Sequence, residues 1–350
     1  MAKVVVWTQA YNAEKTLRRA MDSILQQTYT DFEYYVLNNA STDGTGAIIE
    51  EYAKKDPRVI PLSVERNSIK ASKPFLLNIA KTKNMQWLVW CDADDSYSPD
   101  FLKKSIDFAE TEHLDLVASG YDYVDGSTNQ TLKIKSLKEN LILEKNTFID
   151  HFVEFRAYTT TVWAKLINFP SYISIITRDV DDSYKAYTES SGVLALFKQA
   201  DRVGILKDVM YHYYQYPSSL IRTLDPAFFF GYNQHWDILK QYVASYGPIS
   251  NRNMDFLYAI YLSFIEERLN TIYAAPISFD QKIKYITDIL DNNRAKETFS
   301  RNASPEFRNL AARKNFLDEI YNQVANLQKQ ANISYDLSDL FRIIDCLQEL

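Results

Sequence analysis

In the segment Trp87-Leu88-Val89-Trp90-Cys91-Asp92-Ala93-Asp94-Asp95, an apolar run ends directly in a turn with three carboxylates. A short continuous apolar run of this kind predicts a strand buried on both faces. In an open parallel sheet, ligands bind just beyond the carboxyl ends of the strands. The acidic residues therefore stand where a binding site is expected.

The residues before and around this strand alternate between strand-like and helix-like patterns. We expect strands over 4–7, 34–37, 59–62 and 87–91, and helices over 17–25, 43–55 and 74–83. Strand-helix-strand repetition at this spacing predicts a mostly parallel sheet with helices on both faces. The predicted fold class is α/β and Rossmann-like.

The later part of the chain has a different sequence pattern. Residues 113–225 give only weak signals, with strands expected at 114–117 and 203–206 and a helix at 146–155. From Asp225 onward, apolar residues recur at helical spacing in three stripes. We therefore expect a first domain over 1–224, with halves 1–110 and 111–224, and an all-helical domain over 225–350.

Composition excludes several classes of protein. A formal net charge of −6 argues against a nucleic-acid partner. Cys91 and Cys346 lie too far apart for zinc-type spacing, which also fits a reducing, cytoplasmic location. Gly44-Thr45-Gly46 lacks the third glycine of a dinucleotide fingerprint. No run reaches the eighteen or so apolar residues of a membrane helix.

The acidic turn predicts a cation site. Asp92, Asp94 and Asp95 repel one another unless a cation neutralises them. Mg²⁺ and Mn²⁺ prefer one or two carboxylates together with the phosphates of a substrate, an arrangement that suits a diphosphate leaving group. The alternative is a solvated turn that caps the following helix through Ser98 and Pro99.

Four motifs in a fixed order give the first part of the chain a recognisable resemblance. They are Gln9–Asn12, the helix-forming Leu17–Tyr29, Asn38–Asp43 and Asp92–Asp95. Over residues 3–110 the chain resembles family 2 glycosyltransferases of the GT-A fold. The resemblance implies inverting transfer of a sugar from a nucleotide diphosphate sugar, with a UDP-sugar expected first, and Mn²⁺ or Mg²⁺ on the diphosphate.

The resemblance also implies roles for individual residues. Substrate-binding roles fall on Thr8, Gln9, Ala10, Tyr11, Asn38, Asn39, Lys73, Asp92, Ala93 and Asp94. It implies that Asp94 and Asp95 hold the metal. To these we add His212, because imidazole suits Mn²⁺, with a hydrogen-bonded histidine on a half-buried strand as the alternative.

Two departures from the family pattern concern the donor site. Asn38-Asn39 stands where the family has paired aspartates, so the preferred nucleotide is open. Leu76-Leu77-Asn78 stands where the family has Ala-Arg-Asn, so the usual arginine is missing. Lys70 or Lys73 supplies the positive charge instead, or both form an exposed helix start.

An inverting transfer needs one general base for the acceptor hydroxyl. The position implied by the family falls on Glu189, in the segment Tyr187-Thr188-Glu189. The nearby cluster Asp179, Asp181 and Asp182 competes for this role, and we carry Asp182 as the second candidate. A capping or solvated carboxylate is the remaining interpretation.

The acceptor side is less defined by the sequence. The expected acceptor is a glycan or lipid-linked glycan in surface polysaccharide or oligosaccharide synthesis, by analogy with the family. Tyr211, Tyr213, Tyr214 and Tyr216 either stack on acceptor sugars or pack in the core. The helical domain either packs on itself, forms a homodimer, or holds a lipid-linked acceptor at the inner face of the membrane.

Three other functions remain in competition. A nucleotide-sugar-binding protein without turnover would explain the altered Asn38-Asn39. A nucleotidyltransferase would need a glycine-rich basic loop after the first strand, and Gln9–Ala13 contains no glycine. An assembly protein would act through its helical tail and bind no nucleotide.

Overall fold

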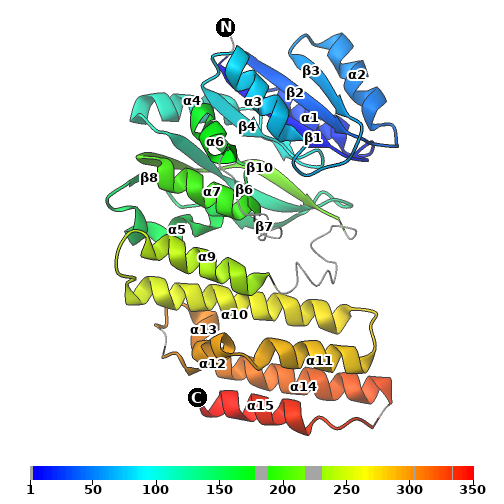
Figure 1. Cartoon of the computed structure of the whole chain (residues 1–350), viewed down its shortest axis with the longest axis vertical. Coiled ribbons are helices and arrows are strands. Elements are labelled where there is room, and N and C mark those ends of the chain that lie inside the picture. The colour runs from blue at the N-terminus through cyan, green and yellow to red at the C-terminus, as the bar shows by residue number, and fades with distance from the viewer. Residues whose placement is uncertain (1–2, 178–187, 217–230, 303, 333) are drawn as a thin grey trace. The chain divides into compact units, whose positions relative to one another are not determined.

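The computed structural model describes residues 3–177, 188–216, 231–302, 304–332 and 334–350. The chain divides into two compact units, residues 1–217 and 218–350, which we call the α/β unit and the helical unit (Figure 1). The boundary expected near Leu224 falls in the segment 217–230, outside the described residues.

The first half of the α/β unit is a parallel sheet, as predicted. Its strands are β1 (Val4–Ala10), β2 (Phe32–Asn39), β3 (Val59–Val64) and β4 (Trp87–Trp90), in the order β3-β2-β1-β4. In the strand register, Val6 of β1 pairs with Tyr34 of β2 on one side and with Val89 of β4 on the other. The central strand β1 is buried along almost its whole length, which explains its run of β-branched residues.

Three helices connect these strands: α1 (Leu17–Leu25), α2 (Thr45–Lys55) and α3 (Ser72–Thr82). Helix α1 buries Leu17, Ala20, Met21 and Ile24, the face that its apolar spacing predicts. Helix α2 begins at Thr45 rather than at Asp43, because the Asp43 carboxylate accepts a hydrogen bond from the Thr45 amide (3.0 Å) ahead of the first turn.

The second half of the unit mixes strand directions. The sheet continues from β4 in the order β9-β6-β10-β5, and β9 runs antiparallel to both of its neighbours. Strands β7 and β8 pair at the margins with β6 and β10. The bounds are β5 (Ser96–Tyr97), α4 (Phe101–Glu112), β6 (Leu116–Asp125), β7 (Thr131–Lys135), β8 (Leu141–Glu144), β9 (Lys165–Asn168), α6 (Phe169–Ile176), α7 (Thr188–Gln199) and β10 (Arg202–Gln215).

Two expectations for this half are wrong in extent. The helix expected over 146–155 is broken into a 3-10 turn, η1 (Phe148–His151), and the short α5 (Phe152–Phe155), followed by η2 (Arg156–Thr159). Phe148, Phe152 and Phe155 are all buried here, so packing of large rings decides the backbone path. The strand expected at 203–206 extends to Gln215, because β10 pairs with β6 from Val203 to Gln215.

The helical unit contains α9 (Tyr232–Ala244), α10 (Asn251–Ala274), α11 (Phe279–Leu290), α12 (Asn293–Ser300), α13 (Arg308–Ala311), α14 (Arg313–Ala331) and α15 (Ser338–Glu349). Most residues of the expected stripes are buried, with Leu257, Leu317 and Ile344 fully so, whereas Tyr321 of the second stripe is 41% exposed. Ser278 and Gln281 form a capping box at the start of α11. Among the described helices, none combines the length and apolarity that crossing a membrane requires.

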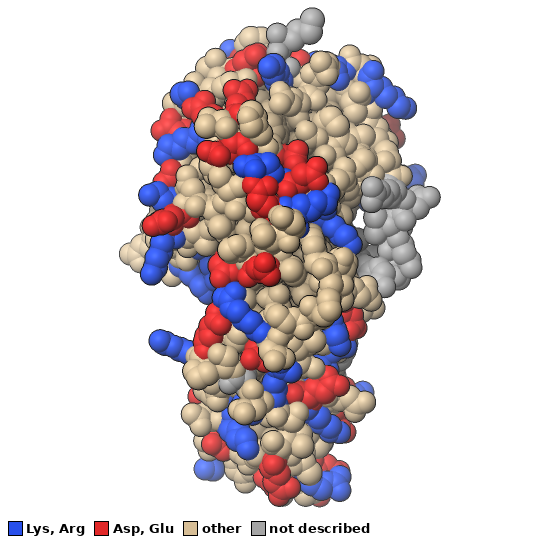
Figure 2. All heavy atoms as spheres, turned by 90° about the vertical axis from the view of Figure 1, so that its left-hand side faces the viewer, with Lys and Arg blue, Asp and Glu red and all other residues tan. Residues whose placement is uncertain are grey.

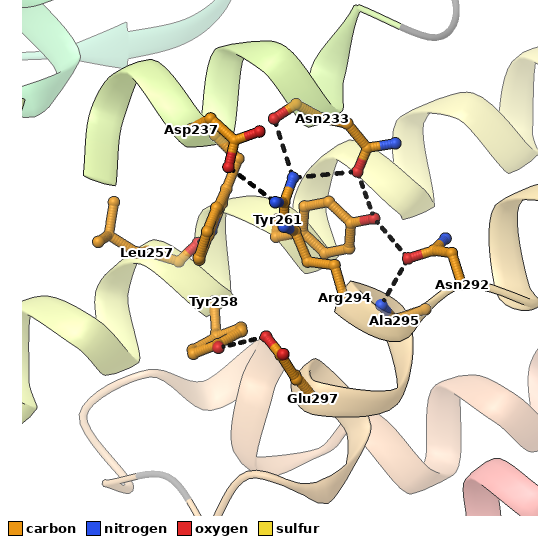
Figure 3. A network of polar contacts seen from close by, with 10 residues as sticks. Asn233, Asp237, Leu257, Tyr258, Tyr261, Asn292, Arg294, Ala295 and Glu297 are labelled. Atoms are coloured by element: carbon orange, nitrogen blue, oxygen red, sulfur yellow. Dashed lines mark hydrogen bonds and ion pairs between the residues drawn. The ribbon is translucent and has the colours of Figure 1, made fainter. Parts of the chain in front are cut away.

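A polar network centred on Arg294 ties three of these helices together (Figure 3). Its guanidinium donates to the Asn233 carbonyl (2.9 Å) and to the Asp237 carboxylate (2.7 Å), both on α9. The same group lies 4.3 Å from the centroid of the Trp236 ring. Tyr261 of α10 donates to the Asn233 side chain (2.9 Å), so α9, α10 and α12 share one network.

The surface carries charges of both signs. On the face shown in Figure 2, basic and acidic side chains are interspersed and neither sign forms a large continuous patch. This mixture agrees with the modest net charge of −6.

Candidate functional site

The loops that follow β1 and β2 form a fixed rim at the carboxyl edge of the sheet. The Asn12 amide donates to Ser41 Oγ (3.1 Å), and the Thr42 amide donates to Asn12 Oδ1 (2.8 Å). Asn12 adopts a positive φ of 48°, which asparagine tolerates better than most residues. Tyr11 projects from this rim with 49% of its surface exposed, so its ring is available for stacking.

Two predicted substrate-binding amides hold the loop after β3. Gln9 Nε2 donates to the Ser68 carbonyl (2.9 Å). Asn39 donates to Asn67 Oδ1 (2.8 Å) and accepts from the Ser68 amide (3.1 Å). Gln9 Oε1 is buried and has no partner among the described residues, so it is an acceptor that a ligand can use.

Three other predicted donor-site residues support the rim rather than line it. Thr8 is fully buried, and its hydroxyl donates to the Cys91 carbonyl (2.8 Å). Ala10 is also fully buried, so a direct contact between its side chain and a base is not available in this structure. Asn38 Oδ1 accepts from the Ser41 amide (3.0 Å), which closes the turn after β2.

The acidic turn lies between β4 and β5, and its carboxylates differ in environment. Asp92 Oδ1 accepts from the Trp90 indole (3.0 Å), and Ala93 is buried beneath the turn. Asp94 is half-buried, and its carboxylate accepts no hydrogen bond from any other described residue. Burial raises the pKa of Asp94, because the charged form has lost part of its hydration.

Asp95 anchors the acidic turn through two hydrogen bonds. It is fully buried, and Tyr211 donates to its Oδ2 (2.6 Å) while the Tyr214 amide donates to its Oδ1 (2.8 Å). Burial, followed by the charges of Asp92 and Asp94, raises the pKa of Asp95 well above its usual range. Each carboxylate oxygen of Asp95 therefore already accepts one hydrogen bond.

The hydrogen-bond partners of His212 are Asp122 and Ser98, not the carboxylates of the acidic turn. Its Nδ1 lies 2.8 Å from Asp122 Oδ1, and its Nε2 lies 3.1 Å from Ser98 Oγ. Neighbouring residues of a strand point to opposite faces, and it is Tyr211 that faces Asp95. The histidine is therefore a hydrogen-bonded strand residue on the other face of the sheet.

The remaining predicted residues are only partly placed. Lys73 lies half-buried in the first turn of α3, and no ion pair joins it to another described residue. Glu189 falls in the first turn of α7, but its side chain lies outside the described part of the chain. Asp179, Asp181 and Asp182 lie wholly outside it.

Sequence reasoning missed Arg19, which contacts the acidic turn. Its Nη2 donates to the main-chain carbonyl of Asp94 and to the Tyr216 hydroxyl (2.9 Å), and its guanidinium lies 3.5 Å from the centroid of the Tyr214 ring. The contacts join α1 to the end of β10, 197 positions away in the sequence for Tyr216. A helical pattern alone places Arg19 beside the buried stripe but does not reveal what it faces.

The tyrosines near the end of β10 differ in burial. Tyr211 is fully buried and stacks on Trp163, with ring centroids 4.5 Å apart. Tyr213 also stacks on Trp163 (5.5 Å) but is only half-buried. Of the predicted sugar-stacking rings, Tyr211 is therefore a core residue.

The turn offers part of a cation site. Among the described residues, no three His, Cys, Asp or Glu side chains are grouped so that they could hold a metal ion. Asp94 nevertheless fits a divalent cation that takes its remaining ligands from substrate phosphates and water, because such cations often use only one or two carboxylates. The donor set fits Mn²⁺ or Mg²⁺ together with a diphosphate.

The mostly parallel sheet with flanking helices has a GT-A-like fold. Residues 6–170 match the model of glycosyl transferase family 2. The whole chain also resembles a crystal structure of S. aureus TarS 1-349 in complex with UDP-GlcNAc. The TM-score is 0.51 at 18% identity, covering 92% of this chain and 81% of that one, which shows the fold.

Curated relatives match over part of the chain. The uncharacterized glycosyltransferase EpsJ of Bacillus subtilis is 27% identical over 213 residues, covering 60% of each chain. The poly(ribitol-phosphate) beta-N-acetylglucosaminyltransferase TarS of Staphylococcus aureus is 25% identical over 217 residues, covering 61% of this chain and 35% of TarS. The match thus spans less than two thirds of the length of either relative.

Proposed function

We propose that this protein is an inverting glycosyltransferase that moves a sugar from a UDP-sugar to a glycan or lipid-linked acceptor. One observation carries the proposal: the half-buried Asp94 carboxylate, unpaired with any other described side chain, at the carboxyl end of β4. The exposed Tyr11 ring stands at the same edge of the sheet, because β1 and β4 run parallel as neighbours. A nucleotide can stack on Tyr11 while its diphosphate reaches the turn.

A divalent cation belongs to this proposal. Mn²⁺ or Mg²⁺, held by Asp94 and the donor, would neutralise the negative charge that develops on the departing diphosphate. Asp95 then contributes indirectly, since its bonds to Tyr211 and Tyr214 fix the turn that presents Asp94. His212 and Asp95 are left out of the cation site.

The acceptor side completes the proposed reaction. The acceptor oxygen attacks the anomeric carbon as the bond from that carbon to the diphosphate breaks. Glu189, in the first turn of α7, takes the proton of the acceptor hydroxyl, with Asp182 as the alternative base. The helical unit is proposed to hold the acceptor or to form a homodimer.

The names of relatives guide the choice of substrates. TarS is named for transfer of N-acetylglucosamine to poly(ribitol-phosphate), and another relative for teichuronic acid biosynthesis. Both names support synthesis of a surface polymer and make UDP-GlcNAc the first donor to test.

Release of nucleoside diphosphate tests the proposal. The protein is incubated with Mn²⁺ and with UDP-GlcNAc, UDP-glucose, UDP-galactose or GDP-mannose, with and without an alditol-phosphate oligomer or lipid-linked glycan. We expect Mn²⁺-dependent release from one donor, lost in Asp94→Asn and retained in Asp107→Asn, a change at an exposed carboxylate of α4. Nucleotide binding without release from any donor would instead identify a binding protein.

A further inference from the structure

Arg19 presents an incompletely used guanidinium at the acidic turn. Only Nη2 is engaged, with the Asp94 carbonyl and the Tyr216 hydroxyl. Nη1 donates to no described residue, and Nε is buried without a partner in the described part of the chain. A guanidinium has five N–H donors; two are on the engaged Nη2 and one is on the buried Nε, so the two of Nη1 remain for a ligand.

The rest of the turn has the wrong charge for a diphosphate. Asp92, Asp94 and Asp95 are all acidic, and a diphosphate brought beside them adds further negative charge. The positive charge of Arg19 acts electrostatically on the turn: it lowers the pKa of Asp94 and so opposes the larger rise that burial causes. A planar guanidinium matches phosphate oxygens better than a lysine ammonium does.

The guanidinium is also held in one orientation. Its stacking on Tyr214, at 3.5 Å from the ring centroid, fixes the plane of the fork, and Nη2 fixes its rotation within that plane. The main chain of Tyr214 is held in turn, because its N–H donates a hydrogen bond to Asp95 Oδ1 (2.8 Å). A ligand that meets Nη1 therefore encounters a preorganised donor rather than a flexible side chain.

We propose that Arg19 binds the diphosphate of the nucleotide donor through Nη1, while Nη2 remains on the turn. The assignment rests on the proposed function and adds a residue to it. It also gives the anionic donor a cationic protein side chain in contact with the turn. Lys73, by comparison, forms no ion pair and no side-chain hydrogen bond with another described residue.

The test compares a ligand that has the diphosphate with one that lacks it. Dissociation constants of UDP and uridine are measured by calorimetry in wild type, Arg19→Gln, Arg19→Lys and the control Arg18→Gln. Arg18 lies next on the same helix, is half exposed, and pairs instead with Glu51. A loss of about tenfold to a hundredfold for UDP, with uridine unchanged, is expected in Arg19→Gln.

The variants separate this assignment from a structural role. Arg19→Lys keeps the positive charge but lacks the planar guanidinium, and it should bind UDP several-fold more weakly than wild type. If Arg19→Gln does not fold, the affinity of Arg19→Lys for UDP tests the assignment. Equal losses for UDP and uridine, or no loss for either, would overturn the assignment while leaving the proposed function standing. If wild type binds no nucleotide, the proposed function fails and takes this assignment with it.

Discussion

The Tyr211 hydroxyl donates a 2.6 Å hydrogen bond to Asp95 Oδ2, joining β10 to the acidic turn across 116 positions of sequence. Both groups are fully buried. The Tyr214 amide completes the contact at the other oxygen (2.8 Å). The turn after β4 is thus held in place by β10, and its outer carboxylate, Asp94, is left for a ligand.

Removing the Asp95 carboxylate should destabilise the α/β unit. Asp95→Ala leaves the Tyr211 hydroxyl and the Tyr214 amide buried without an acceptor, at a cost of about 1–3 kcal/mol for each group. Asp95→Asn should cost much less, because its oxygen can accept from Tyr214 while its amide donates to the Tyr211 oxygen. Urea unfolding measures both, and equal stability of the two variants would contradict the anchoring role.

The same carboxylate predicts a pH dependence. Since burial raises the pKa of Asp95 in the folded state, the folded protein binds more protons than the unfolded chain above the ordinary value of 3.8. The contribution of Asp95 to the free energy of unfolding is therefore fully present below pH 3.8. It is lost as the pH rises through the pKa of Asp95 in the folded state. The stability of Asp95→Asn relative to wild type should increase from about pH 4 to about pH 7, measured by urea unfolding. A constant difference would show that the pKa is not raised.

Asn39 should control the loop after β3. Its oxygen accepts from the Ser68 amide (3.1 Å), and its nitrogen donates to Asn67 (2.8 Å). In Asn39→Ala the Ser68 amide should exchange with deuterium faster, by about fivefold to thirtyfold for a lost bond of roughly 1–2 kcal/mol. Asn67→Ala keeps the Ser68 bond and serves as the control. Unchanged exchange in Asn39→Ala would remove this residue from the support of the loop.

Arg294 should stabilise the helical unit. Arg294→Met keeps much of the apolar stem but leaves the Asn233 carbonyl and Asp237 without their donor, and we expect a loss of about 1–3 kcal/mol (Figure 3). Lys296→Met, which removes an exposed ion pair with Asp291, should change the stability by less than about 1 kcal/mol. Thermal unfolding distinguishes the two, and similar effects would contradict a central role for Arg294.

The sequence predicted the first half of the sheet well, because each strand there is an apolar run followed by a helix with one apolar face. Val4–Ala10 and Trp87–Trp90 are examples. The second half was harder, since β9 reverses direction and β10 is extended by pairing with β6. Such pairing depends on contacts distant in sequence, which periodicity does not report.

The candidate site was predicted by position but not by role. The order of motifs placed Tyr11, Asn39 and Asp94 at one edge of the sheet. It could not tell that Asp95 is engaged from both sides, or that both ring nitrogens of His212 are occupied. Arg19 was missed for the same reason: its partners lie on the acidic turn and on β10, far from it in the sequence.

Calorimetric titration of UDP with and without Mn²⁺ tests the central claim most directly. It is performed on wild type, Asp94→Asn and the control Asp107→Asn. We predict that Mn²⁺ tightens UDP binding by at least about tenfold in wild type and in Asp107→Asn, and that Asp94→Asn loses this enhancement. UDP binding that ignores Mn²⁺, or an enhancement that survives in Asp94→Asn, would contradict the assignment of the acidic turn as the site of the metal and the diphosphate.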